Sequence, residues 1–238
     1  MTPPPPRGAR VRAKLTVERL RELYPAVTEL AHKNAFELLI ATILSAQTTD
    51  RSVNLVTPEL FRRYPTPIDL AAADPAEVER LIKPTGFFRA KTQRIIAASR
   101  ALVDLFGGEV PRTMDELTKI PGIGRKTANV ILGAGFGIPG FAVDTHVIRL
   151  TNRIGLVQTK DPVKIEFQVT SMVPPDEWTA LSLRLILHGR RICDARQPRC
   201  GECALNDFCP SSLARPNRRL RKGRPIGEAP GSDIKLTR

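Results

Sequence analysis

KIPGIGRKTANV, from Lys119 to Val130, fixes the architecture expected of this chain. A proline and two glycines, Gly122 and Gly124, predict a tight turn between two short helices. The glycines leave backbone amides free of side-chain bulk, and the second helix adds the unpaired amides and the positive dipole end of its first turn. Such an arrangement suits a phosphate and reads no base. A plain turn between packed helices is the competing interpretation, and the glycines alone do not exclude it.

Two cations, Arg125 and Lys126, follow this turn directly. A lysine in the first turn of a helix lies near the positive end of the dipole, and both this dipole and a neighbouring arginine favour the neutral amine. A neutral amine is the form that Schiff-base chemistry needs. Lys126 is therefore a candidate nucleophile, with a solvated surface lysine as the ordinary alternative. Arg125 is a candidate for contact with a phosphate or for a structural role.

An aspartate further along the chain is the second candidate for catalysis. Asp144 lies in FAVDTHVIRLTNR, residues 141–153, where it precedes a helical segment and fits the N-cap position. It becomes a catalytic candidate only if the fold brings it close to Lys126. The 17 residues between the two include one short helix and a loop rich in glycine and proline, long enough to turn back.

The rest of the sequence favours an all-α fold. Helix-start signals recur, each with a capping side chain and three of the four with a glutamate three residues later. They occur at Asn34, Asp74, Thr113 and Asp161. No Asn-Gly or Asp-Gly hairpin and no long alternation of polar and apolar residues indicates a strand. The segment AFELLIATIL, residues 35–44, is apolar on nearly every face and predicts a central buried helix.

The net charge of +13 at pH 7, in a chain of 238 residues, favours a polyanionic partner, most often nucleic acid. Most of the excess lies at the two ends. Residues 1–14 hold four basic side chains and no acid, and residues 214–238 hold eight basic and two acidic ones. We expect a disordered basic arm over residues 1–14 and a disordered basic tail over residues 214–238. No segment is long and apolar enough for a membrane span, and the N-terminus lacks the apolar stretch of a secretory signal.

All four cysteines fall within CDARQPRCGECALNDFC, which indicates one shared site. They are Cys193, Cys200, Cys203 and Cys209. Two disulfides are disfavoured, because the sequence shows no export signal. Zinc usually takes two short knuckles, and only the middle pair of cysteines forms one. A [4Fe–4S] cluster accepts four thiolates from a single compact loop, so the spacing leaves zinc and iron–sulfur open.

The cysteine loop is also basic. Arg196 and Arg199 lie between the first two cysteines, and we expect them to contact a phosphate. The alternative is that they only offset the negative charge of the thiolates.

Taken in order, the turn IPGIGRKTA, the VDTH at residues 143–146 and the cysteine loop resemble the endonuclease III family of DNA glycosylases. This family belongs to the helix-hairpin-helix superfamily. The resemblance includes LSAQTTDRSVN at residues 44–54 and TGFFRAKTQRI at residues 85–95, and it covers about residues 30–213. It implies that the four cysteines hold a [4Fe–4S] cluster.

The resemblance also implies two helical lobes around a DNA-binding cleft. One is a six-helix barrel with the helix-hairpin-helix, over residues 29–138. The other is the cluster domain, formed by residues 15–28 together with residues 139–213.

The implied function is that of a base-excision-repair DNA glycosylase with AP lyase activity. Neutral Lys126 displaces the damaged base from C1′, Asp144 stabilises the positive charge that develops on the sugar, and β-elimination cuts the strand 3′ to the abasic site. The implied substrates are oxidised pyrimidines of the thymine glycol type and abasic sites in double-stranded DNA. The enzyme is expected to be a bacterial-type cytoplasmic monomer associated with the nucleoid.

Further positions follow from the motif match. Gln47 is expected to enter the gap left by the flipped base. Phe87 is expected to be the apolar wedge that holds the base stack open, with Phe88 as a close rival. His146 and Arg149 are candidates for phosphate contact or for support of the cluster.

Other functions fit the residues less well. The adenine glycosylase branch lacks the lysine and uses a carboxylate where this chain has Thr42, and the eight-oxoguanine branch typically lacks the cysteine loop. A non-catalytic DNA-binding module and a redox-sensing cluster protein are the alternatives from other classes. Lys126 together with Asp144 favours the glycosylase over both.

Overall fold

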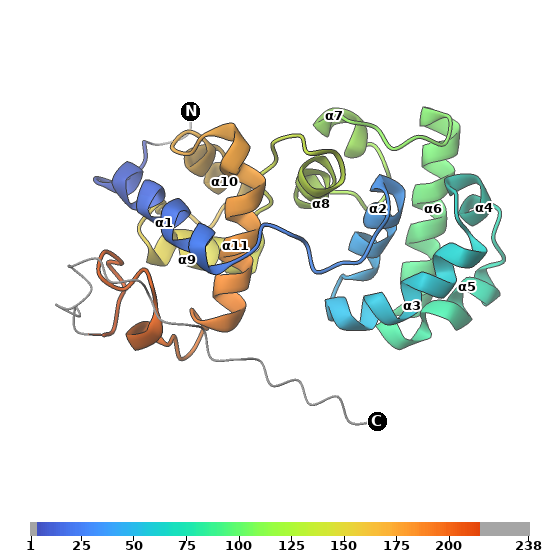
Figure 1. Ribbon diagram of the computed structural model, residues 1–238. Helices are drawn as coiled ribbons and strands as arrows, with labels where there is room; N and C mark the ends of the chain where they lie inside the picture. The colour runs from blue at the N-terminus through green and yellow to red at the C-terminus, as the bar shows by residue number, and fades with distance from the viewer. Residues whose placement is uncertain (1–3, 215–238) are drawn as a thin grey trace, which may run out of the picture.

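A computed structural model describes residues 4–214, and these residues form helices and loops with no strand (Figure 1). The all-α prediction is therefore confirmed. Except for Ala214, the basic tail predicted for residues 214–238 lies outside the described residues. None of the described helices is long and apolar enough to cross a membrane.

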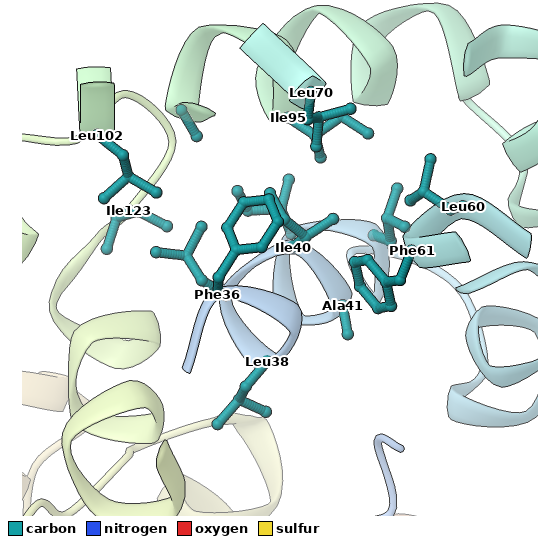
Figure 2. Close-up of a cluster of buried hydrophobic side chains, with 14 of the residues drawn as sticks. Phe36, Leu38, Ile40, Ala41, Leu60, Phe61, Leu70, Ile95, Leu102 and Ile123 are labelled. Carbon is teal, nitrogen blue, oxygen red and sulfur yellow. The ribbon is translucent and has the colours of Figure 1, made fainter. Parts of the chain in front are cut away.

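One half of the molecule, on the right in Figure 1, is built around a buried helix. This helix is α2, and every residue from Phe36 to Ala41 is buried (Figure 2). Its surroundings are α3 to α8, a 3-10 turn η1 and a π-helical turn η2. The bounds are α2 Ala35–Leu44, α3 Asp50–Arg63, α4 Pro67–Ala71, α5 Pro75–Ile82, η1 Lys83–Thr85, α6 Phe88–Phe106, α7 Met114–Leu117, α8 Arg125–Val130 and η2 Ile131–Gly135. The central buried helix predicted over residues 35–44 is confirmed with the same bounds.

The other half combines the N-terminal helix with the C-terminal part of the chain, on the left in Figure 1. Its elements are α1 Ala9–Leu23, α9 Thr145–Arg153, α10 Pro162–Thr170, η3 Pro175–Glu177, α11 Trp178–Arg191 and η4 Cys200–Glu202. They enclose a second apolar core, in which Leu20, Leu150 and Leu185 are fully buried. Two separate cores support the predicted division of the chain into two domains, whose boundaries remain a prediction.

The disordered arm predicted for residues 1–14 is wrong from Ala9 onward, because α1 begins there. Ala9 and Ala13 are buried against the rest of the lobe. Arg12 donates a hydrogen bond to the carbonyl oxygen of Gly155 at 2.7 Å. Burial of the alanines and pairing of the arginine offset the entropy cost of ordering this basic segment.

The four helix-start signals are confirmed by side-chain caps. Each side-chain oxygen accepts a hydrogen bond from a backbone amide in the first turn, which satisfies a donor that the helix itself leaves unpaired. The capping residues are Asn34, Asp74, Thr113 and Asp161.

Candidate active site

The glycine turn joins α7 to α8. Gly122 has a φ of 84°, a left-handed conformation that a residue with a Cβ atom rarely adopts. Gly124 stands at the N-cap of α8 without a side-chain cap. A Cβ atom at either glycine would meet no atom within 4 Å, so the outer side of the turn is open. The predicted helix, turn and helix are therefore present, with an accessible backbone.

Lys126 lies in the first turn of α8 with an exposed side chain. It lines a cleft of about 120 Å³ between the two halves of the molecule. Asp144 lines the same cleft from the other half. Thr42, Ser45, Asn129, Ala142 and Ser182 are among the other lining residues. The fold thus brings together the two candidate catalytic residues, which was the condition that Asp144 had to meet.

Asp144 is also the N-cap of α9. Its Oδ1 accepts a hydrogen bond from the amide of Val147 at 2.8 Å, so the N-cap interpretation is correct. In the described part of the chain its other oxygen, Oδ2, has no hydrogen-bond partner. The cap fixes the carboxylate on the rim of the cleft and leaves one oxygen for a second task.

An ion-pair network crosses the cleft beside these residues. Arg190 of α11 pairs with Asp50 at 2.9 Å and with Glu29, and all three residues line the cleft. Arg190 thereby ties α11 to the start of α3 and to the segment before α2. No local sequence signal indicates this contact, because Arg190 is 140 positions from Asp50 and 161 positions from Glu29.

Arg125 is held by the other half of the molecule. Its Nε and Nη2 each donate to a carboxylate oxygen of Glu166 in α10, both at 2.7 Å. Its guanidinium also lies over the ring of Phe167, 5.1 Å from the centroid. Two of its three nitrogens are therefore used within the protein. This supports the structural alternative for Arg125 and leaves its predicted contact with DNA untested.

Gln47 and Phe87 share an uncommon backbone conformation. Among the described residues they are the only non-glycine residues with a positive φ, at 55° and 47°. Such strain is concentrated at functional sites, and both side chains are exposed. Phe88 instead packs partly buried against the core around α2. This contrast favours Phe87 over Phe88 as the wedge.

Arg149 contacts the start of the cysteine loop, and His146 contacts Arg149. Arg149 donates to the carbonyl oxygens of Gly189 and Cys193, each at 3.0 Å, and its Nη2 lies 3.0 Å from Nδ1 of His146. Burial lowers the pKa of His146, and the charge of Arg149 also lowers it. These contacts support the predicted role beside the cluster rather than a contact with phosphate.

The two arginines of the cysteine loop differ. Arg196 is exposed. Arg199 donates to the carbonyl oxygen of Arg191 and to Glu202, the latter at 3.2 Å, and so braces the loop. Arg196 is therefore the better candidate for a phosphate contact.

The four cysteines line one cavity at the end of α11, and all four are free thiols of intermediate exposure. Among residues 4–214, no group of three or more His, Cys, Asp or Glu side chains is gathered closely enough to hold a single metal ion. A single zinc ion needs its ligands tightly around one centre. A [4Fe–4S] cluster places each thiolate on a different iron atom, so four sulfurs around a cavity suit it better.

Polar groups approach the cysteine sulfurs. Nη1 of Arg153 donates to Sγ of Cys193 at 3.3 Å, and Nε2 of His188 lies 3.3 Å from Sγ of Cys203. The other ring nitrogen of His188 lies 3.1 Å from the hydroxyl of Tyr24. Burial lowers the pKa of His188 to about 4, so its ring is neutral at neutral pH. The histidine within the apolar run LRLILHG was the only sequence signal for this buried group.

The chain is similar in sequence to known DNA repair proteins. Residues 40–175 match the HhH-GPD superfamily base excision DNA repair protein, and residues 193–209 match the iron-sulfur binding domain of endonuclease III. Endonuclease III of Synechocystis sp. is 50% identical over 197 residues, covering 82% of this chain and 90% of that protein. Endonuclease III of Bacillus subtilis is 43% identical over 208 residues, covering 87% and 95%.

Two solved structures have the same fold. A trapped endonuclease III–DNA covalent intermediate has a TM-score of 0.80 and 41% identity, covering 85% of this chain and 96% of that one. A non-covalent endonuclease III–DNA complex also has a TM-score of 0.80, with 40% identity, covering 90% and 99%.

Proposed function

The chain belongs to the endonuclease III family of the HhH-GPD superfamily, and we propose that it is a DNA glycosylase and AP lyase with Lys126 as its nucleophile. The observation that carries the proposal is the cleft that Lys126 and Asp144 share. An exposed amine on one half faces a cleft with a helix-capping carboxylate on the other. A flipped nucleotide that enters between the halves meets both groups.

The reaction uses the two groups in sequence. The lone pair of Nζ of Lys126 attacks C1′ of the damaged nucleotide, and the glycosidic bond breaks with its electrons leaving on the base. Oδ2 of Asp144 stabilises the positive charge on the sugar and accepts the proton that the attacking amine loses. The C1′–O4′ bond then breaks as the C1′=N bond of the Schiff base forms, and O4′ takes up that proton to become a hydroxyl. The Schiff base acidifies the C2′ proton. Loss of that proton breaks the C3′–O bond and cuts the strand 3′ to the lesion.

DNA is bound in this proposal as a bent duplex across the cleft. The open backbone of Gly122 and Gly124 approaches a phosphate, and Arg196 approaches another. Gln47 fills the gap beside the orphaned base while Phe87 separates the neighbouring pairs. The substrates are oxidised pyrimidines of the thymine glycol type and abasic sites. One chain contains the whole cleft, so the protein acts as a monomer at the nucleoid in this proposal. A solution mass of twice 26.3 kDa would contradict the monomer.

The [4Fe–4S] cluster supplies a covalent cross-link of the cysteine loop, through Cys193, Cys200, Cys203 and Cys209. The chain's own residues prepare its cavity. Arg149 donates to the loop backbone at Cys193, and Arg199 ties the loop to the end of α11. Arg153 and His188 approach the sulfurs. No step of the reaction depends on the cluster in this proposal.

Borohydride trapping on duplex DNA with an abasic site tests the nucleophile. We expect wild type to form a covalent adduct and Lys126→Gln to form none, because only the amine makes a reducible Schiff base. Lys119→Gln is the matched control, since it removes an exposed lysine from the same hairpin. An adduct that persists in Lys126→Gln contradicts the proposal. A panel of duplexes with thymine glycol, uracil or mismatched adenine then defines the substrate class.

A further inference from the structure

Lys91 of α6 is almost completely buried, with 2% of its surface exposed. Buried lysines are rare, because an ammonium group loses its hydration unless the protein replaces it. In the described part of the chain Lys91 has no carboxylate partner. Its Nζ donates one hydrogen bond, to the carbonyl oxygen of Thr85 at 2.7 Å. Burial lowers the pKa of Lys91. Because burial of the amine costs its hydration, we infer that its hydrogen bond to Thr85 has a specific role.

The acceptor belongs to the turn that carries Phe87. Thr85 ends η1, and the next two residues, Gly86 and Phe87, both have a positive φ, at 68° and 47°. The backbone amide of Lys91 donates to the carbonyl oxygen of Phe87 at 3.0 Å. Lys91 therefore makes two hydrogen bonds to the turn, one from its side chain to Thr85 and one from its backbone amide to Phe87.

The geometry of this turn decides where the phenyl ring points. Phe87 is 69% exposed, whereas the following Phe88 packs against the core. A left-handed phenylalanine persists only where its surroundings hold it. The buried amine is the only side-chain group outside the turn with a hydrogen bond to residues 85–87 among the described residues.

We propose that Lys91 is a positioning residue that holds Phe87 in its exposed, left-handed conformation so that the ring can enter the DNA base stack. Lys91 acts through Phe87 and does not touch DNA itself. This inference rests on the proposed function, in which Phe87 is the wedge. It extends the DNA-binding machinery to a side chain that lies in the core.

The test uses Lys91→Met, which keeps the apolar stem and removes the donor. Base unstacking is followed by the fluorescence of 2-aminopurine beside a thymine glycol in a duplex. We expect a weaker fluorescence rise and about a tenfold loss of kcat/KM on that duplex, corresponding to about 1.4 kcal/mol. Adduct formation on a single-stranded abasic oligonucleotide should stay within about twofold, because that substrate has no duplex stack to open. Lys83→Met, an exposed lysine of η1, is the matched control for loss of charge.

A double-mutant cycle separates positioning from general damage. If Lys91 acts through Phe87, the double variant Phe87→Ala, Lys91→Met loses no more unstacking than Phe87→Ala alone. If the double variant loses more unstacking than Phe87→Ala alone, the inference is overturned. An unchanged fluorescence rise in folded Lys91→Met overturns it as well.

Gly86→Ala probes the same turn if Lys91→Met does not fold. An added Cβ there meets nothing within 4 Å, but the φ of 68° becomes strained, so the turn changes while the core does not. We expect Gly86→Ala to show the same loss of unstacking and to keep its adduct formation on the single-stranded abasic oligonucleotide. Normal unstacking in this variant overturns the inference. Base unstacking does not require the covalent reaction. If wild type forms no adduct, the proposed lyase function is contradicted, while the fluorescence measurement still tests the role of Lys91.

Discussion

Arg125 of α8 and Glu166 of α10 join the two halves of the molecule through a two-point ion pair, with both N–O distances at 2.7 Å. Glu166 is buried, at 8% exposed. Lys126 is the residue after Arg125, and Asp144 belongs to the half that carries Glu166. The pair therefore fixes the position of the proposed nucleophile relative to the carboxylate that assists it.

Glu166→Gln tests this linkage. The substitution keeps the shape and leaves the Arg125 charge without its partner, so we expect the free energy of unfolding to fall by roughly 1–3 kcal/mol. The rate of borohydride trapping should fall as well, because the hairpin is less firmly held. Glu59→Gln is the control: its exposed pair with Arg62 lies within α3, and we expect a smaller loss of stability because solvent screens an exposed ion pair. Equal urea midpoints for the two variants would sink the prediction.

Asp144 allows its two roles to be separated. Asparagine caps a helix as well as aspartate does but carries no charge, whereas alanine has neither the capping oxygen nor the charge. We expect Asp144→Asn to keep its unfolding free energy within a few tenths of a kcal/mol and to lose about a hundredfold in kcat. We expect Asp144→Ala to show a similar loss of kcat and, in addition, a free energy of unfolding that is lower by about 1 kcal/mol. Full activity in folded Asp144→Asn would show that the carboxylate is only a cap.

Phe87 and Phe88 form a matched pair for the wedge. Phe88→Ala should lower the free energy of unfolding by about 1–3 kcal/mol, because its ring packs against the core around α2. Phe87→Ala should leave stability within about 0.5 kcal/mol, since its ring is exposed, and should weaken 2-aminopurine unstacking. A loss of unstacking in Phe88→Ala alone, measured where both variants are folded, would reverse the assignment.

The parts of the fold that the sequence predicted well depend on local interactions. A cap at Asn34 or Thr113 bonds three residues ahead, and the central helix at residues 35–44 follows from its own apolar pattern. The start of α1 was missed because it depends on Arg12 reaching Gly155, 143 positions away. Local charge and proline content cannot show such a contact.

The site divides in the same way. Lys126 and Asp144 were predicted from short motifs and from the resemblance, and the tertiary structure was needed to place them on one cleft. The ion pair of Arg125 with Glu166 and the burial of Lys91 had no local signal. Each depends on helices that meet only in the folded chain.

A third long-range contact leads to the cluster. The hydroxyl of Tyr24 lies 3.1 Å from Nδ1 of His188, and Nε2 of His188 lies 3.3 Å from Sγ of Cys203. If the hydroxyl donates to Nδ1, the neutral ring keeps its proton on Nε2, where it donates to the sulfur. Hydrogen bonds to the sulfurs of an iron–sulfur cluster raise its reduction potential.

Tyr24→Phe removes the donor that fixes this tautomer and leaves the ring in place. We expect the visible absorbance of the cluster to persist and its reduction potential to fall by roughly 40 mV, because a hydrogen bond contributes about 1 kcal/mol and 59 mV is a tenfold change for one electron. Protein-film voltammetry provides the measurement. Tyr64→Phe is the control, since its hydroxyl donates to Glu77 of α5, and α5 lies on the opposite side of the molecule from the cysteine loop in Figure 1. An equal shift in both variants, or none in Tyr24→Phe, would show that the histidine donates to Cys203 without help from the tyrosine.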